Sequence, residues 1–456
     1  MAIVGILVAV ATAVTHAGQA SAESLVDTLI AAYLTNPQLS AQRIRLRETD
    51  EGVNQALSNW RPTIELSSSI GKEYNNSTLR TGSAQSQHRD QTSVELDLSQ
   101  PLFRGGRTMA ETSSAENSVL AERARLTVQE QDTMLAAATA YLDVFRDQAV
   151  LQLNWNNEDI LTRQLEAAQD RFQVGEITRT DVHQAVARLA QATADRIQSE
   201  ANLESSRATY RTVTGISPTT NFDLPASPPG APLSRDAAMQ EAALNNPRVI
   251  AAQYDERAAI DSIDIVWGEM LPEVDFNFSA SRETNASSES DRSKTAEALI
   301  NLAVPLYQAG GVSSRVREAK QTAGRFRQVV DQERRAATEA ATRAWENVQA
   351  AEARVTSFHS QIQAATVALD GVQREADVGS RTVLDVLDAE QELLNARVSY
   401  ITAQRDSGVA RFQLLSSVGK LTAHHLQLPV ELYDPDSHYR EIREKWYGLS
   451  ASGEDE

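Results

Sequence analysis

The sequence predicts a mostly α-helical protein with a small transmembrane β portion, built from a duplicated unit of two strands and long helices. An ordered set of Asn, Pro and Gly positions recurs about 210, and later about 204, residues further along the chain. Each copy holds two segments in which apolar and polar residues alternate. The aromatic fraction is only 5%, while Ala, Gln, Glu and Arg are abundant, and this composition favours long, closely packed helices.

Charge and cysteine content exclude several classes of protein. The 456 residues carry a formal net charge of -19. This acidic balance argues against nucleic acid as a partner, because phosphate binding needs a basic surface. The chain has no cysteine, so disulfides and thiolate metal sites cannot form. We expect no cofactor and no metal ion.

Residues 1–22 have the pattern of a secretory signal peptide. Ala2 to Val14 is an almost unbroken apolar run, and Ala20-Ser21-Ala22 offers a small-x-small cleavage site. A buried first helix is the alternative. Beyond Ala22 no run of eighteen apolar residues occurs, so the sequence predicts no membrane-spanning helix. We therefore expect an exported chain that is periplasmic, secreted or placed in an outer membrane.

The duplication predicts two structural repeats, at 23–215 and 234–419, separated by a Pro-rich linker at 216–233 and followed by a polar tail at 420–456. The matched positions agree in residue type and order, and include Asn36 with Asn246, Pro37 with Pro247, Pro101 with Pro305, Gly175 with Gly379, and Gly215 with Gly419. The offset changes between the two strand segments, where a surface loop can shorten freely.

Each repeat is expected to begin with a short helix, capped by Ser24 or Ser234, that ends at an Asn-Pro pair. A helix of about 22 residues follows and runs to the strands. Beyond the strands come long and then returning helical patterns, at 107–172 and 179–213 in the first copy and at 312–376 and 383–417 in the second. Each long helix would span about 100 Å at 1.5 Å per residue. A returning helix and a 22-residue helix together nearly match a long one, so we expect continuous and stacked helices to alternate.

The alternating segments predict two hairpins. Ile64, Leu66 and Ile70 alternate with polar residues, and segments of about ten residues with this period are typical of barrel strands. An ordinary half-buried hairpin is the alternative. Two hairpins give four strands, which are too few to close a barrel, and open sheet edges do not occur in hydrocarbon. Several subunits would therefore share one barrel, and three copies would give twelve strands.

Four aromatic residues stand beside the predicted strand ends that face the helices. They are Trp60, Phe103, Trp267 and Tyr307. Aromatic side chains at this level form girdles at membrane interfaces. Ordinary packing is the alternative for each residue taken singly.

The motifs resemble the TolC family of outer-membrane channels. The resemblance rests on the paired Asn-Pro and Pro-Leu-aromatic segments, on Arg171-Phe172-Gln173-Val174-Gly175, and on the string VGSRTVLDVLDA from Val378 to Ala389. It covers nearly all of the chain after the signal peptide. The segment from Gly419-Lys420-Leu421 to Lys445-Trp446 is similar to the type I secretion subgroup.

The resemblance implies a homotrimer with a twelve-stranded β-barrel in the outer membrane, continuous with a long periplasmic α-helical barrel. It implies an export duct of a tripartite type I secretion or efflux system. The expected partners are a periplasmic adaptor protein, an inner-membrane ABC transporter or proton antiporter, and outer-membrane lipid. Multidrug efflux rather than protein secretion is the alternative.

The resemblance also places the periplasmic tips at the two turns formed by Val174 and Gly175 and by Val378 and Gly379. The adaptor protein would dock on these four residues. Long helices would separate the turns from the strands.

By the same resemblance, a gate lies beside the second turn. Arg381 would bridge to Asp181 in a neighbouring coil, and threefold symmetry would place Asp385 and Asp388 as carboxylate rings. Crowded like charges raise the pKa of carboxylates and attract cations. Ala376 stands where the family has a constricting tyrosine, so the set of closing links is smaller. The alternative for these charged residues is helix capping.

Two rival functions are weaker. Asp385 and Asp388 could form an acid–base pair, and His424 with His425 could bind a metal ion. The sequence offers no third ligand at suitable spacing and no nucleophile motif, so we expect no enzyme. A periplasmic adaptor protein is the other rival, but it would show one helical hairpin between strand-rich domains rather than two copies.

Overall fold

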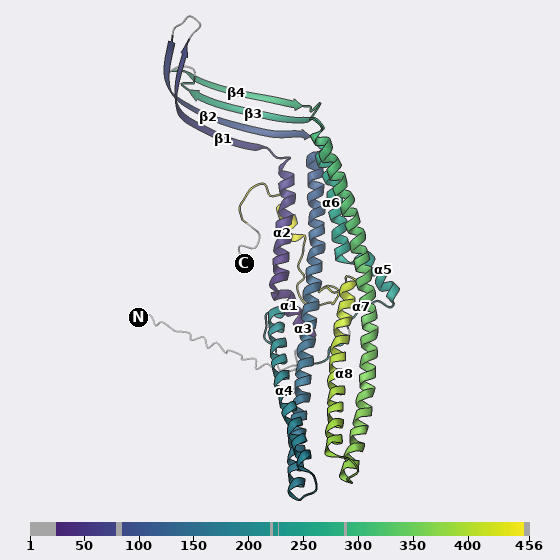
Figure 1. Cartoon of the computed structure of the whole chain (residues 1–456). Coiled ribbons are helices and arrows are strands. Elements are labelled where there is room, and N and C mark those ends of the chain that lie inside the picture. The colour runs from purple at the N-terminus through teal and green to yellow at the C-terminus, as the bar shows by residue number, and fades with distance from the viewer. Residues whose placement is uncertain (1–23, 79–83, 219–221, 227, 287–289, 451–456) are drawn as a thin grey trace, which may run out of the picture. The chain divides into compact units, whose positions relative to one another are not determined.

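The computed structural model describes residues 24–78, 84–218, 222–226, 228–286 and 290–450. The predicted signal peptide at 1–22 lies outside these residues. Along the described chain, two short helices, two strands and two longer helices follow one another, and the same order of six elements then occurs again (Figure 1). The repeated element order agrees with the predicted duplication.

The first set of elements consists of α1 (Leu25–Thr35), α2 (Pro37–Ser58), β1 (Thr63–Thr78), β2 (Ala84–Arg104), α3 (Arg107–Gln173) and α4 (Arg179–Thr214). The second set consists of α5 (Arg235–Asn245), α6 (Pro247–Gly268), β3 (Glu273–Thr284), β4 (Arg292–Ala303), α7 (Gly311–Asp377) and α8 (Val383–Ser417). A short helix, α9 (Ser437–Ile442), follows the second set. The helix bounds lie within a few residues of the predicted ones.

Local chemistry explains where the short helices begin and end. The Ser24 hydroxyl accepts a hydrogen bond of 3.1 Å from the Asp27 N–H, and Ser234 caps α5 in the same way. Asn36 has an extended backbone, with φ -66° and ψ 122°, because the following proline disfavours helical geometry before it. The predicted Ser caps and Asn-Pro breaks are therefore confirmed.

The four strands form one antiparallel sheet in the order β1-β2-β3-β4. The strands of the first hairpin, at 16 and 21 residues, are longer than the predicted segments. Backbone pairing continues beyond Ile70 into a polar stretch where the apolar alternation stops, with Lys72 opposite Asp90. The register between β2 and β3 shifts between Pro101 and Phe103, as expected where a proline has no N–H to donate to the ladder.

The chain divides into two compact units. We call them the tip unit, whose described residues lie within 24–36, 134–229 and 348–412, and the sheet unit, whose described residues lie within 37–133, 230–347 and 413–450. Each unit contains a part of both long helices, α3 and α7.

In the tip unit, the helices form two hairpins, α3 with α4 and α7 with α8 (Figure 1). The contacts join α4 to α3, α3 to α8, and α8 to α7 in turn, through Asn154–Ser199 at 2.6 Å, Asp143–Arg405 at 2.8 Å and Glu352–Arg411 at 2.9 Å. Helix α1 contacts α4, where the hydroxyls of Thr28 and Tyr210 lie 3.0 Å apart. Long and short helices thus alternate within this unit.

In the sheet unit, α2, α3, α6 and α7 are joined in that order. The contacts are Gln42–Glu122 at 2.7 Å between α2 and α3, Ser113–Asp261 at 2.8 Å between α3 and α6, and Glu256–Arg327 at 3.1 Å between α6 and α7. Long and short helices therefore alternate in this unit too. None of the helices in the described part of the chain combines the length and the apolar character that a membrane span requires.

The segment after Gly419 was predicted to be a polar tail, yet it also contains buried side chains. Leu421 and Ile442 are buried, and the Glu130 carboxylate of α3 accepts a hydrogen bond of 2.7 Å from the Ala423 N–H. His438 of α9 lies 3.1 Å from the buried Asp50 of α2. The apolar residues in this segment are too widely spaced to predict an element, so its packing was not visible in the sequence.

Candidate gate and docking tips

The two turns at the ends of the hairpins have the same backbone geometry. Gly175 and Gly379 both have φ 78°, a left-handed conformation that favours glycine. The N–H groups of the residues that follow, Glu176 and Ser380, each bond to the carbonyl five residues earlier, at 2.9 Å. These bonds complete the ends of α3 and α7, as in a Schellman motif. The turns predicted at these positions are present in both copies.

The valines before these glycines are exposed. Val174 is 79% exposed and Val378 is 80% exposed. Scattered exposed apolar residues are common on protein surfaces. The same residue stands at the same position of both turns, however, so the exposure is a repeated feature of the fold.

The helices after the turns begin with matching capping boxes. The hydroxyl and N–H of Thr178 donate to the Asp181 carboxylate at 2.8 and 2.9 Å, and Thr382 donates to Asp385 at the same two distances. Within one chain, Asp181 and Asp385 therefore both cap helices. Helix capping was the alternative to a gate role for these residues. The Thr382 hydrogen bonds, aided by Arg381, hold the pKa of Asp385 below its usual range. This shift is opposite in sign to the rise expected for a crowded carboxylate ring.

Arg381 contacts acidic side chains of its own turn. Its guanidinium lies 2.8 Å from Glu375 and 4.0 Å from Asp385, and the structure shows no ion pair between Arg381 and Asp181 within the chain. The bridge from Arg381 to Asp181 stays a prediction for neighbouring subunits. Sequence reasoning missed Glu375, although a signal existed, since the equivalent position in the first copy is Arg171.

The two turns thus carry ion pairs of opposite polarity. In the first turn, Arg171 at the end of α3 lies 2.8 Å from Glu176 in the loop. In the second turn, Glu375 at the end of α7 pairs with Arg381 in the loop. The backbones are equivalent, the charge at the helix end is reversed, and the charged loop partners stand one position apart.

Asp388 is paired with the first hairpin. Its carboxylate accepts a hydrogen bond from the guanidinium of Arg188 on α4. Sequence reasoning missed Arg188 as well, because the two residues lie about 200 positions apart and no local pattern links them. Of the four predicted gate residues, Arg381 and Asp385 therefore share one turn, Asp388 contacts α4, and Asp181 caps α4.

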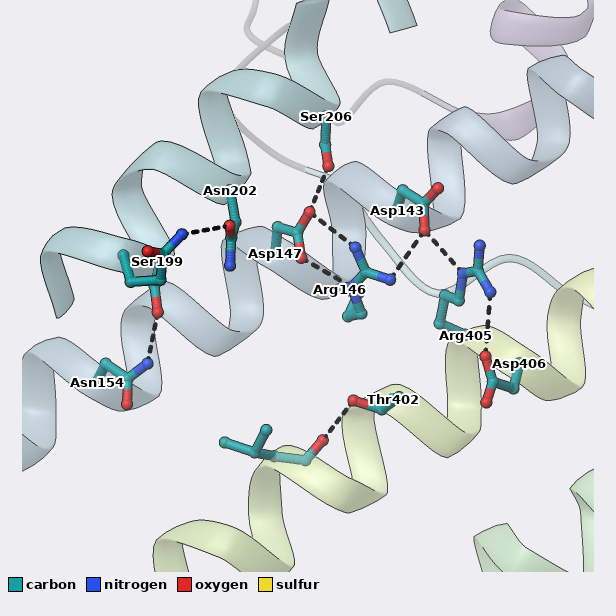
Figure 2. A network of polar contacts seen from close by, with 12 residues as sticks. Asp143, Arg146, Asp147, Asn154, Ser199, Asn202, Ser206, Thr402, Arg405 and Asp406 are labelled. Carbon is teal, nitrogen blue, oxygen red and sulfur yellow. Dashed lines mark hydrogen bonds and ion pairs between the residues drawn. The ribbon is translucent and has the colours of Figure 1, made fainter. Parts of the chain in front are cut away.

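Farther along the tip-unit helices from the turns, a network of charges joins α3 to both α4 and α8 (Figure 2). Asp143 lies between two arginines, at 3.1 Å from Arg146 and 2.8 Å from Arg405. Arg146 also bonds to Asp147 at 2.7 Å, and the Ser206 hydroxyl of α4 donates to Asp147. The hydrogen bond with Asp147 raises the pKa of Arg146, although burial opposes this. The network stabilises contacts between helices of both hairpins.

The predicted girdle residues are accessible in the single chain. Trp60, Phe103 and Trp267 are exposed by 44–49%, and Tyr307 by 88%. Trp60 and Tyr307 flank β1 and β4, Phe103 lies near the end of β2, and Trp267 lies near the end of α6. Their role at a membrane interface stays a prediction.

The two histidines of the rival metal site differ in exposure: His424 is exposed and His425 is half-buried. Within the described ranges, no group of three or more His, Asp or Glu side chains is placed to hold a metal ion.

Known proteins are similar to this chain in sequence and in its fold of helical hairpins and one sheet. The sequence profile of a family described as "Outer membrane efflux protein" matches residues 29–216 and 238–420. The outer membrane efflux protein BepC of Brucella suis is 35% identical over 435 residues, which cover 95% of this chain and 93% of BepC. The outer membrane protein TolC of Vibrio cholerae is 25% identical, with 88% of this chain and 92% of TolC covered. The crystal structure of the Vibrio cholerae outer membrane protein VceC shares the fold, with a TM-score of 0.74, 17% identity, and coverage of 87% of this chain and 96% of VceC.

Two long helical hairpins with equivalent turns, and a four-stranded antiparallel sheet, are the fold that the chain shares with VceC. The matching family and the relatives give the class, which is an outer-membrane channel with a long helical periplasmic part. The chain belongs to the outer membrane efflux protein family, which contains the TolC channels. It is therefore a transport protein of the outer membrane, and proteins of this family are channels rather than enzymes.

Proposed function

We propose that the chain is one subunit of a homotrimeric export duct in a tripartite type I secretion or efflux system. An inner-membrane ABC transporter or proton antiporter and a periplasmic adaptor protein would pass the substrate to the duct, which releases it outside the cell. The observation that carries this proposal is the pair of equivalent turns, each presenting an exposed valine at Val174 and Val378.

The sheet supports assembly into a trimer. Its outer strands, β1 and β4, end the sheet on either side, and apolar side chains on these strands are exposed, including Ile64, Ile70 and Ile300. Hydrocarbon leaves no place for an unpaired strand edge. Pairing of β1 with β4 of a neighbouring copy would satisfy both edges, and three copies would close a twelve-stranded barrel.

The second turn supports a gate that can open at little cost. Arg381 is half-exposed and pairs with Glu375 in its own turn. An exposed ion pair is weak, because water screens both charges. Arg381 can therefore exchange Glu375 for Asp181 of a neighbouring coil when the subunits close together, and release it when they part.

Two observations point to different substrates. The segment after Gly419 is similar to the type I secretion subgroup, which favours a secreted protein as the substrate. BepC, at 35% identity, is called an efflux protein, which favours small toxic compounds. We place protein secretion first and multidrug efflux second. Deletion of the gene tests both, because loss of a secreted protein from the medium and increased sensitivity to toxic compounds are separate readouts.

The docking role of the turns is tested by Val174→Ser combined with Val378→Ser in the complemented deletion strain. We expect loss of export and loss of cross-linking between the turns and an adaptor protein, identified by mass spectrometry. Val367→Ser is the matched control, because Val367 is 73% exposed but lies on α7 away from the turns. Undiminished export and cross-linking in the double variant would overturn the docking role.

A further inference from the structure

The first turns of α8 dock on the α3–α4 hairpin within one subunit. Leu387 is only 2% exposed, and it belongs to a buried cluster with Leu161 of α3 and Ala192 of α4. Leu189 and Val383 are packed against this cluster. A side chain from the second hairpin is therefore inserted into an apolar socket formed by the first.

A charged contact stands directly beside this socket. Asp388 follows Leu387 in α8, and Arg188 precedes Leu189 in α4, and these two charged residues form an ion pair. The Arg188 side chain is 36% exposed and the Asp388 side chain is 56% exposed. The apolar socket supplies most of the adhesion, since exposed ion pairs are weak. The ion pair neutralises the charge of the Asp388 carboxylate near the turn.

The ion pair of Arg188 and Asp388 depends on a sequence difference between the two repeats. At the repeat spacing of about 204 residues, the counterpart of Arg188 is Glu392 and the counterpart of Asp388 is Gln184. Glu392 instead accepts a hydrogen bond of 3.0 Å from Gln361 of α7, within the second hairpin. In the described part of the chain, the charged link between the hairpins beside Leu387 joins Arg188 of the first copy to Asp388 of the second.

We propose that Arg188 is a second closing residue of the tip, which holds α8 against the first hairpin and masks the charge of Asp388 in the closed state. This inference rests on the proposed function. When α8 moves away from the first hairpin, Leu387 leaves its socket, the ion pair separates and the Asp388 carboxylate becomes free to attract cations. Arg188 thereby links closure to ion selectivity, at a tip where Ala376 replaces the family's tyrosine.

Planar bilayers containing the purified full-length protein test this role. We expect Arg188→Gln to raise the fraction of open channels by about threefold, the change that a weak exposed ion pair supports. The same variant should increase the preference for cations, because it unmasks Asp388. Asp388→Asn should also favour opening, but it should lower the preference for cations. The two variants therefore separate closure from selectivity.

Three further variants exclude a merely local effect. Exchange of the two charges, Arg188→Asp with Asp388→Arg, should restore closure. Leu387→Ala should favour opening with little change in selectivity, because it weakens the socket and leaves the charges in place. Arg163→Gln is the matched control, since Arg163 pairs at 2.6 Å with Asp159 on the same helix and makes no link between hairpins in the described structure.

The inference is overturned if Arg188→Gln conducts and selects ions like the wild type while Arg381→Ala opens the channel; the proposed function then stands. A wild-type protein that forms no channels overturns the proposed function, and this inference with it. Exchanged charges that leave the channel as open as Arg188→Gln would show that the pair does not close the tip.

Discussion

Asn36 and Asn246 make the same contact in the two repeats. The side-chain amide of Asn36 donates to the carbonyl of Val213 at 3.0 Å, and that of Asn246 donates to the carbonyl of Ser417 at 2.9 Å. Both asparagines are buried, and both acceptors lie at the end of a returning helix. Each Asn-Pro pair therefore ends a short helix and also fixes it to the helix that returns from the tip. The duplication extends to single hydrogen bonds.

We predict that Asn36→Ala and Asn246→Ala each destabilise the protein by about 1–3 kcal/mol, because each removes the hydrogen bond of a buried amide and leaves a partly buried carbonyl without its donor. The temperature at which the helical signal in circular dichroism melts measures the effect. Asn202→Ala is the control, since Asn202 is exposed on α4 and its loss should leave that temperature nearly unchanged. Equal temperatures for all three variants would contradict this interpretation.

The carboxylates of α8 are predicted to make the channel prefer cations. Asp385→Asn with Asp388→Asn should reduce this preference, measured as the reversal potential across a salt gradient. Hydrogen bonds from Thr382 lower the pKa of Asp385, so it stays ionised at neutral pH. Its contribution should therefore persist as the pH falls, and be lost only below the ordinary aspartate pKa of about 3.9. A reversal potential that is the same in the double variant and the wild type would exclude this role.

Glu130 is predicted to make the attachment of the C-terminal segment depend on pH. Burial raises the pKa of Glu130, although the hydrogen bond from the Ala423 N–H opposes the rise. The folded state then holds the proton more tightly than the unfolded state does. The stability contributed by the protonated group is complete below the unfolded pKa of about 4.3 and is lost as the pH rises through the raised pKa.

Glu130→Gln keeps an acceptor for the Ala423 N–H and removes the buried charge. It should therefore gain stability relative to the wild type as the pH is raised from 4 to 8. Glu130→Ala leaves the N–H without its partner and should be less stable than Glu130→Gln by about 1–3 kcal/mol. Thermal melting followed by circular dichroism, after equilibration at each pH, provides the comparison. A constant difference between the wild type and Glu130→Gln at all pH values would refute the prediction.

Local signals predicted much of this fold. Ser24 and Ser234 mark helix starts, the Asn-Pro pairs mark helix ends, and Gly175 and Gly379 mark the turns, because each depends on the residue's own backbone or its near neighbours. The lengths of β1 and β2 were underestimated. The apolar alternation stops at Ile70, but strand pairing continues beyond it, with Lys72 opposite Asp90.

Contacts between distant segments could not be predicted. The pair of Arg188 and Asp388 depends on how Leu387 packs between α3 and α4, and no sequence pattern encodes that docking. Asp181 and Asp385 were assigned to the gate by resemblance, and the single chain shows both as helix caps. A cap and a gate use the same residue type at the same position, so the sequence alone does not separate them.

We propose that the tips form a closable end of an outer-membrane duct. The most direct test is the conductance of Arg381→Ala in planar bilayers, compared with the wild type and with Arg171→Ala. Arg171 is the matched control, because it forms an exposed ion pair with Glu176 at the equivalent turn of the first copy. We predict low conductance for the wild type and Arg171→Ala, and clearly higher conductance for Arg381→Ala. Equal conductance in all three proteins would contradict the account.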